Sequence, residues 1–98
     1  MWWVETPYAR RRPYLILTRN AAIPLLERLF AVPATTTIRG IATEVLLEPS
    51  DGMPAECVLT VDNAETIRKV HFVERVCQLD PSKVRAVCDV LSLAVECS

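Results

Sequence analysis

Hydrophobic positions along the chain predict a series of short strands followed by one helix. Apolar runs rich in β-branched and aromatic residues lie between turn signals at 1–4, 14–18, 29–34, 43–48, 57–61 and 74–78. A short helical or irregular segment is expected around Leu25 to Arg28, and Pro49-Ser50-Asp51-Gly52 predicts a tight turn. Pro33 interrupts the third run, which predicts an edge strand or a bulge. Residues 67–73 give no clear pattern.

The last segment reads as an amphipathic helix. Asp80 is a good N-cap and Pro81 suits the first helical position. Apolar side chains then recur at helical spacing, at Val84, Val87, Cys88, Leu91 and Val95. Many short strands closed by one helix predict a mainly β, α+β fold, in which the helix packs on a small, strongly curved β-barrel.

The length of 98 residues and a hydrophobic content of 51% predict one domain, residues 1–98. So small a domain covers only part of its apolar surface, and we therefore expect a homodimer. The apolar runs are too short to cross a bilayer. We expect no membrane association and a cytoplasmic location.

Charge is distributed unevenly along the chain. Residues 1–40 hold six Lys and Arg against two Asp and Glu, whereas residues 41–98 hold five against ten. This asymmetry indicates a localised face for a polyanion, and it makes nucleic acid the first partner to consider.

The chain offers no pattern for a metal or cofactor. Its four cysteines, Cys57, Cys77, Cys88 and Cys97, contain no CxxC pair, and its single histidine, His71, belongs to no ligand-spaced group. We expect no metal, no cofactor, reduced cysteines and an ordinary surface or packing role for His71.

Two polar segments carry the candidate chemistry. Arg10-Arg11-Arg12-Pro13 leads into the second strand, and Thr35-Thr36-Thr37-Ile38-Arg39-Gly40 follows the third. Antiparallel pairing of these strands would bring Arg12 near Thr35, so that a guanidinium and a hydroxyl face one phosphate. Taken alone, an arginine run more often keeps a strand soluble, and a threonine run more often satisfies local backbone groups. The accompanying Arg39-Gly40 favours the functional interpretation, since glycine allows a ligand close to the backbone.

The order of several segments resembles that of a known family. These are Trp2-Trp3-Val4, Arg12-Pro13-Tyr14-Leu15-Ile16-Leu17 and Val32-Pro33-Ala34-Thr35-Thr36, followed by Glu44-Val45-Leu46-Leu47, Thr66-Ile67 and the helix over 79–95. In these segments the chain resembles the MazF/PemK toxin endoribonucleases of type II toxin–antitoxin systems.

The resemblance implies a SH3-like, CcdB-like barrel, a homodimer and metal-independent cleavage of single-stranded RNA. The 2′-OH would attack the neighbouring phosphorus and leave a 2′,3′-cyclic phosphate and a 5′-OH. The family pattern assigns catalysis to Arg12 and Thr35. RNA contacts are expected from Arg10, Arg11, Thr36, Arg39 and Asn63. The implied protein partner is a MazE-like antitoxin with an acidic tail.

The segment from Thr6 to Arg11 departs from the family, whose loop before the Arg-Pro pair is longer. The arginines of this segment predict a stronger electrostatic attraction to RNA. Trp2 and Trp3 should lie on opposite faces of their strand, one of them inward. Two alternatives stay open: a CcdB-like inhibitor of DNA gyrase, against which the ending Val95-Glu96-Cys97-Ser98 counts, and a catalytically silent RNA-binding barrel.

Overall fold

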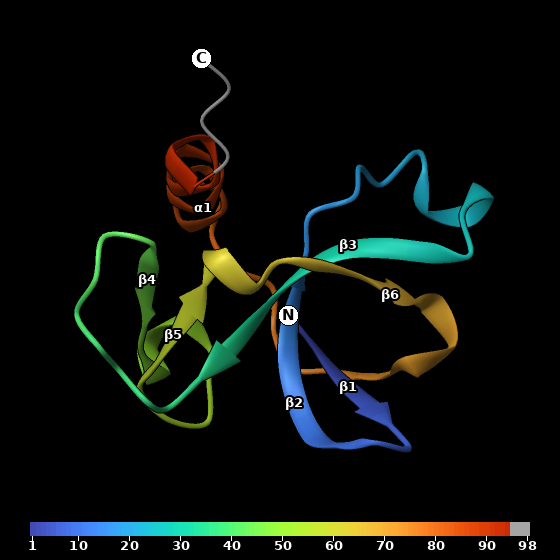
Figure 1. The fold of residues 1–98 in the computed structure, drawn as a ribbon, viewed down its shortest axis with the longest axis horizontal. Helices are drawn as coiled ribbons and strands as arrows, with labels where there is room; N and C mark the ends of the chain where they lie inside the picture. Colours follow the sequence, from blue (N-terminus) through green and yellow to red (C-terminus); the bar gives the residue numbers. More distant parts are fainter. Residues whose placement is uncertain (95–98) are drawn as a thin grey trace.

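The computed structural model describes residues 1–94 and contains seven strands and one α-helix among them (Figure 1). The strands are β1 (Trp2–Thr6), β2 (Ala9–Ile16), β3 (Arg28–Thr35), β4 (Glu44–Leu47), β5 (Cys57–Thr60), β6 (Glu65–Arg68) and β7 (Phe72–Arg75). The helix is α1 (Pro81–Ala94), and the short 3₁₀ turns are η1 (Ile23–Leu25), η2 (Pro49–Asp51), η3 (Val61–Asn63) and η4 (Lys69–His71).

The strands form one curved antiparallel sheet in the order β4-β5-β3-β2-β1-β7, with β6 pairing on β3. The predicted mainly β, α+β fold with a C-terminal helix is confirmed. The barrel is partial, because the end strands β4 and β7 share no ladder and the sheet is not closed. Residues 67–73, whose sequence predicts no element, contain the end of β6, all of η4 and the start of β7.

Strand β3 is an interior strand, so the prediction of an edge strand at Pro33 is wrong. Its first half pairs with β6 through residues 28–31, and its last two residues pair with β5. Pro33 lies between these two ladders, where a missing N–H leaves no ladder bond unmade. The Pro33 carbonyl oxygen accepts a hydrogen bond from Thr60 Oγ1 at 3.2 Å. A switch between partners thus lets a proline occupy the centre of the sheet.

The first hairpin is tighter than the sequence pattern predicts. Only Pro7 and Tyr8 separate β1 from β2, and Val4 pairs with Arg12. The expected loop over residues 6–11 is therefore wrong: the three arginines belong to β2, which begins at Ala9 and not at Tyr14. Pairing with β1 satisfies the backbone of these polar residues, and this overrides their weak strand pattern.

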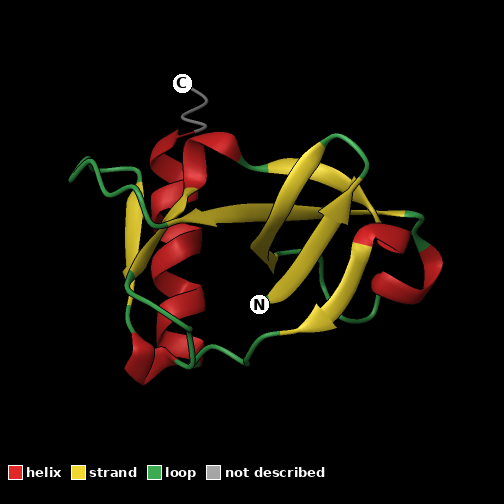
Figure 2. Cartoon of the chain, turned by 90° about the horizontal axis from the view of Figure 1, so that it is seen from below, coloured by secondary structure: helices red, strands yellow, loops and turns green. Residues whose placement is uncertain are grey.

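Helix α1 covers the part of the sheet that contains β4 and β5 (Figures 1 and 2). Asp80 caps it as predicted, since Asp80 Oδ1 accepts a hydrogen bond from the Ser82 N–H at 3.0 Å. The core beneath it is aliphatic, with Leu15, Val32, Ala34, Val45, Leu47, Leu59, Val61, Leu79 and Val87. Cys88 is exposed, so its predicted place in the apolar stripe is wrong; Ala86 and Val90 pack there instead. Val95 lies outside the described residues.

Gly52 is the residue at which a side chain would disturb the fold most directly. It has a φ of +99° at the end of η2, and an added Cβ would lie 2.7 Å from Cys77 Cβ. Gly40 also has a positive φ, of +70°, but its Cβ would meet nothing within 4 Å. A substitution at Gly40 would therefore add backbone strain alone, whereas one at Gly52 would add both strain and steric overlap.

We predict that Gly52→Ala lowers the free energy of unfolding by about 3 kcal/mol, because left-handed strain and overpacking add. Gly40→Ala, the matched control, should lose only about 1 kcal/mol from strain. Urea unfolding followed by circular dichroism measures both. Equal losses in the two variants would show that the Cys77 contact has no energetic weight.

Candidate functional site

Two surface hollows lie beside the arginines of β2. The first, of about 340 Å³, is called the Thr35 hollow; it is lined by Trp3, Arg10, Arg11, Arg12, Pro13, Ala34, Thr35, Thr36, Met53, Pro54, Ala55 and Cys57. The second, of about 370 Å³, is called the His71 hollow; it is lined by Val4, Thr6, Ala9, Arg10, Arg12, Tyr14, Arg28, Glu65, Thr66, Ile67, Arg68 and His71. Arg10 and Arg12 line both.

The β2–β3 ladder brings Arg12 and Thr35 to one hollow. Its pairs are Tyr14–Pro33, Leu15–Val32 and Ile16–Ala31. The ladder ends at Tyr14–Pro33, two residues from Arg12 on one strand and two residues from Thr35 on the other, and both residues line the Thr35 hollow. The antiparallel pairing predicted from the sequence is confirmed.

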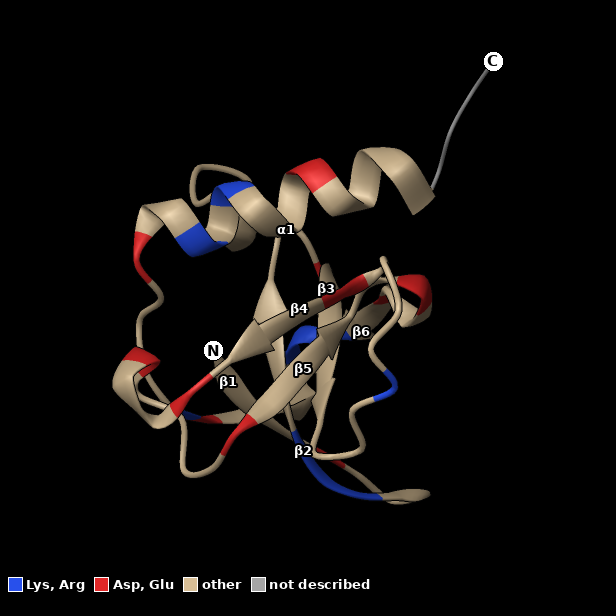
Figure 3. Ribbon diagram, turned by 90° about the vertical axis from the view of Figure 1, so that its left-hand side faces the viewer, with Lys and Arg blue, Asp and Glu red and all other residues tan. Residues whose placement is uncertain are grey.

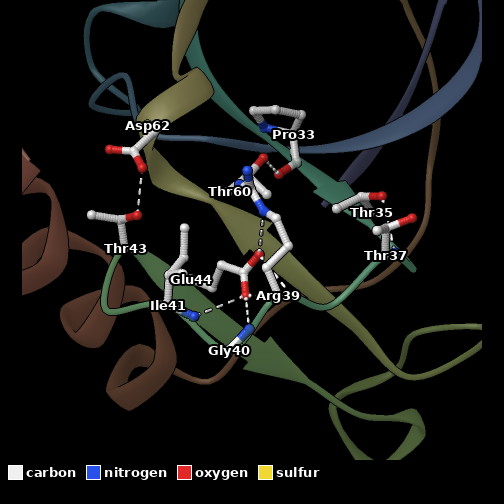
Figure 4. Close-up of polar contacts among 10 residues, drawn as sticks. All are labelled: Pro33, Thr35, Thr37, Arg39, Gly40, Ile41, Thr43, Glu44, Thr60 and Asp62. Atoms are coloured by element: carbon white, nitrogen blue, oxygen red, sulfur yellow. Dashed lines mark hydrogen bonds and ion pairs between the residues drawn. The ribbon is translucent and has the colours of Figure 1, made fainter.

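The Thr35 hydroxyl is held by its own backbone. Thr35 Oγ1 accepts a hydrogen bond from the Thr37 N–H at 3.2 Å (Figure 4). A hydroxyl that accepts from the backbone still has its proton to donate. Thr35 lines the hollow, so its hydroxyl can donate to a ligand bound there.

The three consecutive arginines have different surroundings. Arg11 pairs with Glu74 and with Glu5, whose Oε1 is 3.7 Å from Arg11 Nη1, and its guanidinium lies 4.8 Å from the centre of the Trp3 ring. In the described part of the chain no carboxylate lies within 4.0 Å of Arg10 or Arg12. The basic segment of β2 lies at the end of the molecule opposite α1 (Figure 3). Arg10 and Arg12 thus keep their charge available for an anion.

Arg39 lies in a different setting. Its Nε is 3.3 Å from Glu44 Oε2, and the N–H groups of Arg39 and Gly40 donate to Glu44 Oε1 at 3.0 and 2.8 Å (Figure 4). Desolvation raises the pKa of Glu44, but these hydrogen bonds outweigh it and lower that pKa overall. Glu44 therefore organises the segment after β3 and neutralises Arg39.

Of the residues expected to contact RNA, Arg10, Arg11 and Thr36 join Arg12 and Thr35 at the Thr35 hollow. Arg39 and Asn63 line neither hollow. Asn63 is exposed at the end of η3. Trp2 and Trp3 are both half-buried, so neither is fully inward, and Trp3 lines the Thr35 hollow.

The His71 hollow holds residues that sequence reasoning missed, among them Tyr14, Arg28, Glu65 and Arg68. The pKa of Tyr14 is raised, first by burial and then by Glu65, while Arg12 opposes the shift. Five of the residues that line this hollow come from β6 and η4, and three of them, Ile67, Arg68 and His71, lie in the stretch 67–73 that has no readable pattern. Only the number of cations near it in the sequence could have drawn attention to this region.

Among the described residues, Cys57, Cys77 and Cys88 are free thiols, and burial raises the pKa of Cys57. Residues 1–94 contain no group of three His, Cys, Asp or Glu placed to hold a metal ion. No helix in the same range has the length and apolar character needed to span a bilayer.

Fold and site together define a class: a small α+β protein whose curved antiparallel sheet presents cationic hollows beside one strand. The family model of PemK-like, MazF-like toxins of type II toxin–antitoxin systems matches residues 1–95. The chain is 43% identical to the probable endoribonuclease MazF5 of Mycobacterium tuberculosis, covering 100% of this chain and 91% of that one. The chain belongs to the PemK-like, MazF-like toxin family.

Solved structures agree with this assignment. The toxin MazF-mt6 of Mycobacterium tuberculosis superposes with a TM-score of 0.89 at 30% identity, covering 99% of this chain and 96% of that one. A mycobacterial endoribonuclease in complex with its cognate antitoxin gives a TM-score of 0.85 at 28% identity, with coverages of 99% and 91%. The family resemblance read from the sequence is confirmed.

We predict that Glu44→Gln lowers the thermal midpoint at neutral pH. The folded-state pKa of Glu44 lies below its unfolded value, so the unfolded chain binds more protons as pH falls. The stabilisation is complete above the ordinary glutamate pKa of about 4.3 and is lost as pH falls through the lower folded value. The difference in thermal midpoint between the wild type and Glu44→Gln should therefore become smaller as the pH falls.

Calorimetric scans over a series of acidic buffers test this prediction. Glu56→Gln removes the same charge from an exposed residue that makes no ion pair among the described residues, and it should change the midpoint little. If the difference in thermal midpoint between the wild type and Glu44→Gln stays constant in acid, the ionised Glu44 carboxylate does not organise the segment after β3.

Proposed function

We propose that this chain is a toxin endoribonuclease that cleaves single-stranded RNA without a metal ion. The observation that carries the proposal is the meeting of Arg12 and Thr35, from two neighbouring strands, at one open hollow. The relatives named as endoribonucleases support it, because they match nearly the whole chain.

The reaction needs little beyond charge and positioning. The 2′ oxygen forms a bond to the adjacent phosphorus, the bond from phosphorus to the 5′ oxygen breaks, and the products are a 2′,3′-cyclic phosphate and a 5′-OH. Water takes the 2′ proton and returns one to the leaving oxygen. Arg12 stabilises the charge that grows on the non-bridging oxygens, and Thr35 donates to the same phosphate and fixes it for in-line attack.

The other residues at the Thr35 hollow extend the contact with RNA. Arg10 and Thr36 offer a cation and a hydroxyl beside the reacting phosphate. Arg11 is held by Glu5 and Glu74, and together with Trp3 it forms one edge of the hollow, where RNA can contact both side chains. Arg39 and Asn63 bind RNA outside this hollow, with Arg39 placed by Glu44.

The same basic surface suits an acidic partner. A related endoribonuclease is solved with its cognate antitoxin, and we infer that an acidic antitoxin tail covers Arg10 and Arg12 here and blocks the RNA site. Toxin and antitoxin act in the cytoplasm, where their RNA substrate is found.

We predict that Arg12→Ala lowers kcat/KM for RNA cleavage by about 100-fold or more, since it removes the main charge at the developing dianion. Thr35→Val should also lose most activity, and Thr35→Ser should recover it because the donor returns. The measurement is the mapping of new 5′-hydroxyl ends in total RNA incubated with each protein in EDTA.

Arg85→Ala is the matched control, because Arg85 is exposed on α1 and lines neither hollow. It should cleave like the wild type. Intact RNA with folded wild-type protein would overturn the proposal and leave gyrase inhibition or plain RNA binding. Cuts that survive in Arg12→Ala would remove Arg12 from the mechanism.

We predict a homodimer in solution. Large apolar side chains stay exposed in the described chain, among them Leu25, Val70 and Leu93 at 83%, 69% and 67%. Light scattering after size exclusion should give twice the chain mass of 11.0 kDa. A single-chain mass at micromolar concentration would contradict the prediction.

A further inference from the structure

The segment after β3, residues 36–43, begins and ends at residues that pair with the same strand. Thr35, the last residue of β3, pairs with Val58 in β5, and Glu44, the first residue of β4, pairs with Thr60 in β5. The backbones of Thr35 and Glu44 are therefore fixed relative to one another. Residues 36–43 themselves belong to no strand, so their backbone groups need other partners.

The Glu44 side chain supplies several of these partners. Its carboxylate lies over the segment, and its Oε1 accepts hydrogen bonds from the successive N–H groups of Arg39, Gly40 and Ile41 at 3.0, 2.8 and 3.5 Å (Figure 4). The φ of +70° at Gly40 allows neighbouring N–H groups to converge on one anion. Only 3% of the Glu44 side chain is exposed. The chain's own carboxylate thus fills this cluster of N–H groups, which holds the segment in one shape.

The same segment holds the hydroxyl of Thr35. The Thr37 N–H donates to Thr35 Oγ1 at 3.2 Å, and only Ile38 separates Thr37 from the residues that Glu44 binds. A hydrogen bond accepted from a fixed N–H restricts the Thr35 side chain to rotamers that keep that bond. Thr36, which also lines the Thr35 hollow, belongs to this segment as well. The shape of the segment therefore affects two hydroxyls at the hollow.

We propose that Glu44 is a positioning residue for RNA cleavage: it fixes the segment after β3 and, through the Thr37 N–H, the hydroxyl of Thr35 at the reacting phosphate. The proposal rests on the proposed RNA-cleaving function for the role of Thr35. Glu44 lines neither hollow, so it acts on the reaction only through the segment. We expect an effect on the rate within the bound complex, because catalysis depends on the geometry of the reacting groups more steeply than binding does.

The first test compares cleavage of an RNA substrate by Glu44→Ala and by the wild type. The variant should lower kcat by about tenfold, since Thr35 loses its fixed orientation. KM should not rise, because Arg39 is released from its ion pair and keeps its charge. Glu44→Gln should recover part of kcat, since its amide oxygen can still accept from the three N–H groups. A raised KM with an unchanged kcat would overturn the proposal.

A double-mutant cycle tests whether Glu44 acts through Thr35. In the Thr35→Val background, Glu44→Ala should lower the single-turnover rate by less than about twofold, because the hydroxyl that Glu44 positions is already gone. A tenfold loss in both backgrounds would show that Glu44 acts by another route, and the proposal would then be wrong.

Two variants on α1 are the controls. Val87→Ala removes volume from the buried core and lowers stability without touching the segment. Asp89→Ala removes an exposed carboxylate that makes no ion pair among the described residues. Both should keep the wild-type kcat. A loss of kcat in Val87→Ala equal to that in Glu44→Ala would assign the effect to general destabilisation and contradict the proposal.

The rotamer of Thr35 gives a readout that does not depend on cleavage. Three-bond couplings measured by NMR should report one Thr35 rotamer in the wild type and an average over several in Glu44→Ala. If the wild type cleaves no RNA but the rotamer is averaged in Glu44→Ala, the positioning of Thr35 by Glu44 stands and only the catalytic function fails. If Thr35 keeps one rotamer in Glu44→Ala, the proposal is overturned, whether or not the protein cleaves RNA.

Discussion

The antiparallel register between β2 and β3 is the constraint on which the candidate site depends. Three observed pairs run from Tyr14–Pro33 to Ile16–Ala31, and Arg12 and Thr35 each lie two residues beyond the end of this ladder. A shift of one residue would turn Arg12 to the other face of the sheet and separate it from Thr35. The register is itself held by burial, since Leu15 and Val32 pack in the core beneath α1. Aliphatic packing in the core thus determines the strand register, and the register determines which polar side chains lie near one another at the site.

The change of partner along β3 has a second consequence. β3 pairs with β6 first and with β5 afterwards, so residues from different parts of the sheet line the two hollows beside the arginines of β2. Pro33 fits at this change of partner because it has no N–H to leave unpaired there. The proline that the sequence pattern associates with an edge strand thus marks the place where an interior strand changes its partner.

Local sequence signals predicted the parts of the fold that are decided locally. The Asp80-Pro81 start of α1, the turn at Gly52 and the antiparallel approach of Arg12 to Thr35 follow from capping, positive φ and strand pairing. The placement of Arg10–Arg12 within β2 could not be read, because pairing with β1 overrides a polar pattern. The His71 hollow was also hidden, since its lining comes from β1, β2, β3, β6 and η4, and only the folded sheet brings these together.

The arginines divide into two groups by what surrounds them: some are held by carboxylates, and others have no such partner among the described residues. Arg11 and Arg39 are held by carboxylates, Glu74 and Glu44 among them, and they stabilise the hairpin and the segment after β3. The arginines that line the His71 hollow have no such partner in the described chain, and two of them oppose each other across a ladder. Glu65 also lines this hollow, but it lies beyond 4.0 Å from all of these arginines. Like charges in directly opposed positions destabilise a sheet, so the Arg28–Arg68 pair lowers the stability of the free protein, and an anion placed between the two side chains would reduce that cost.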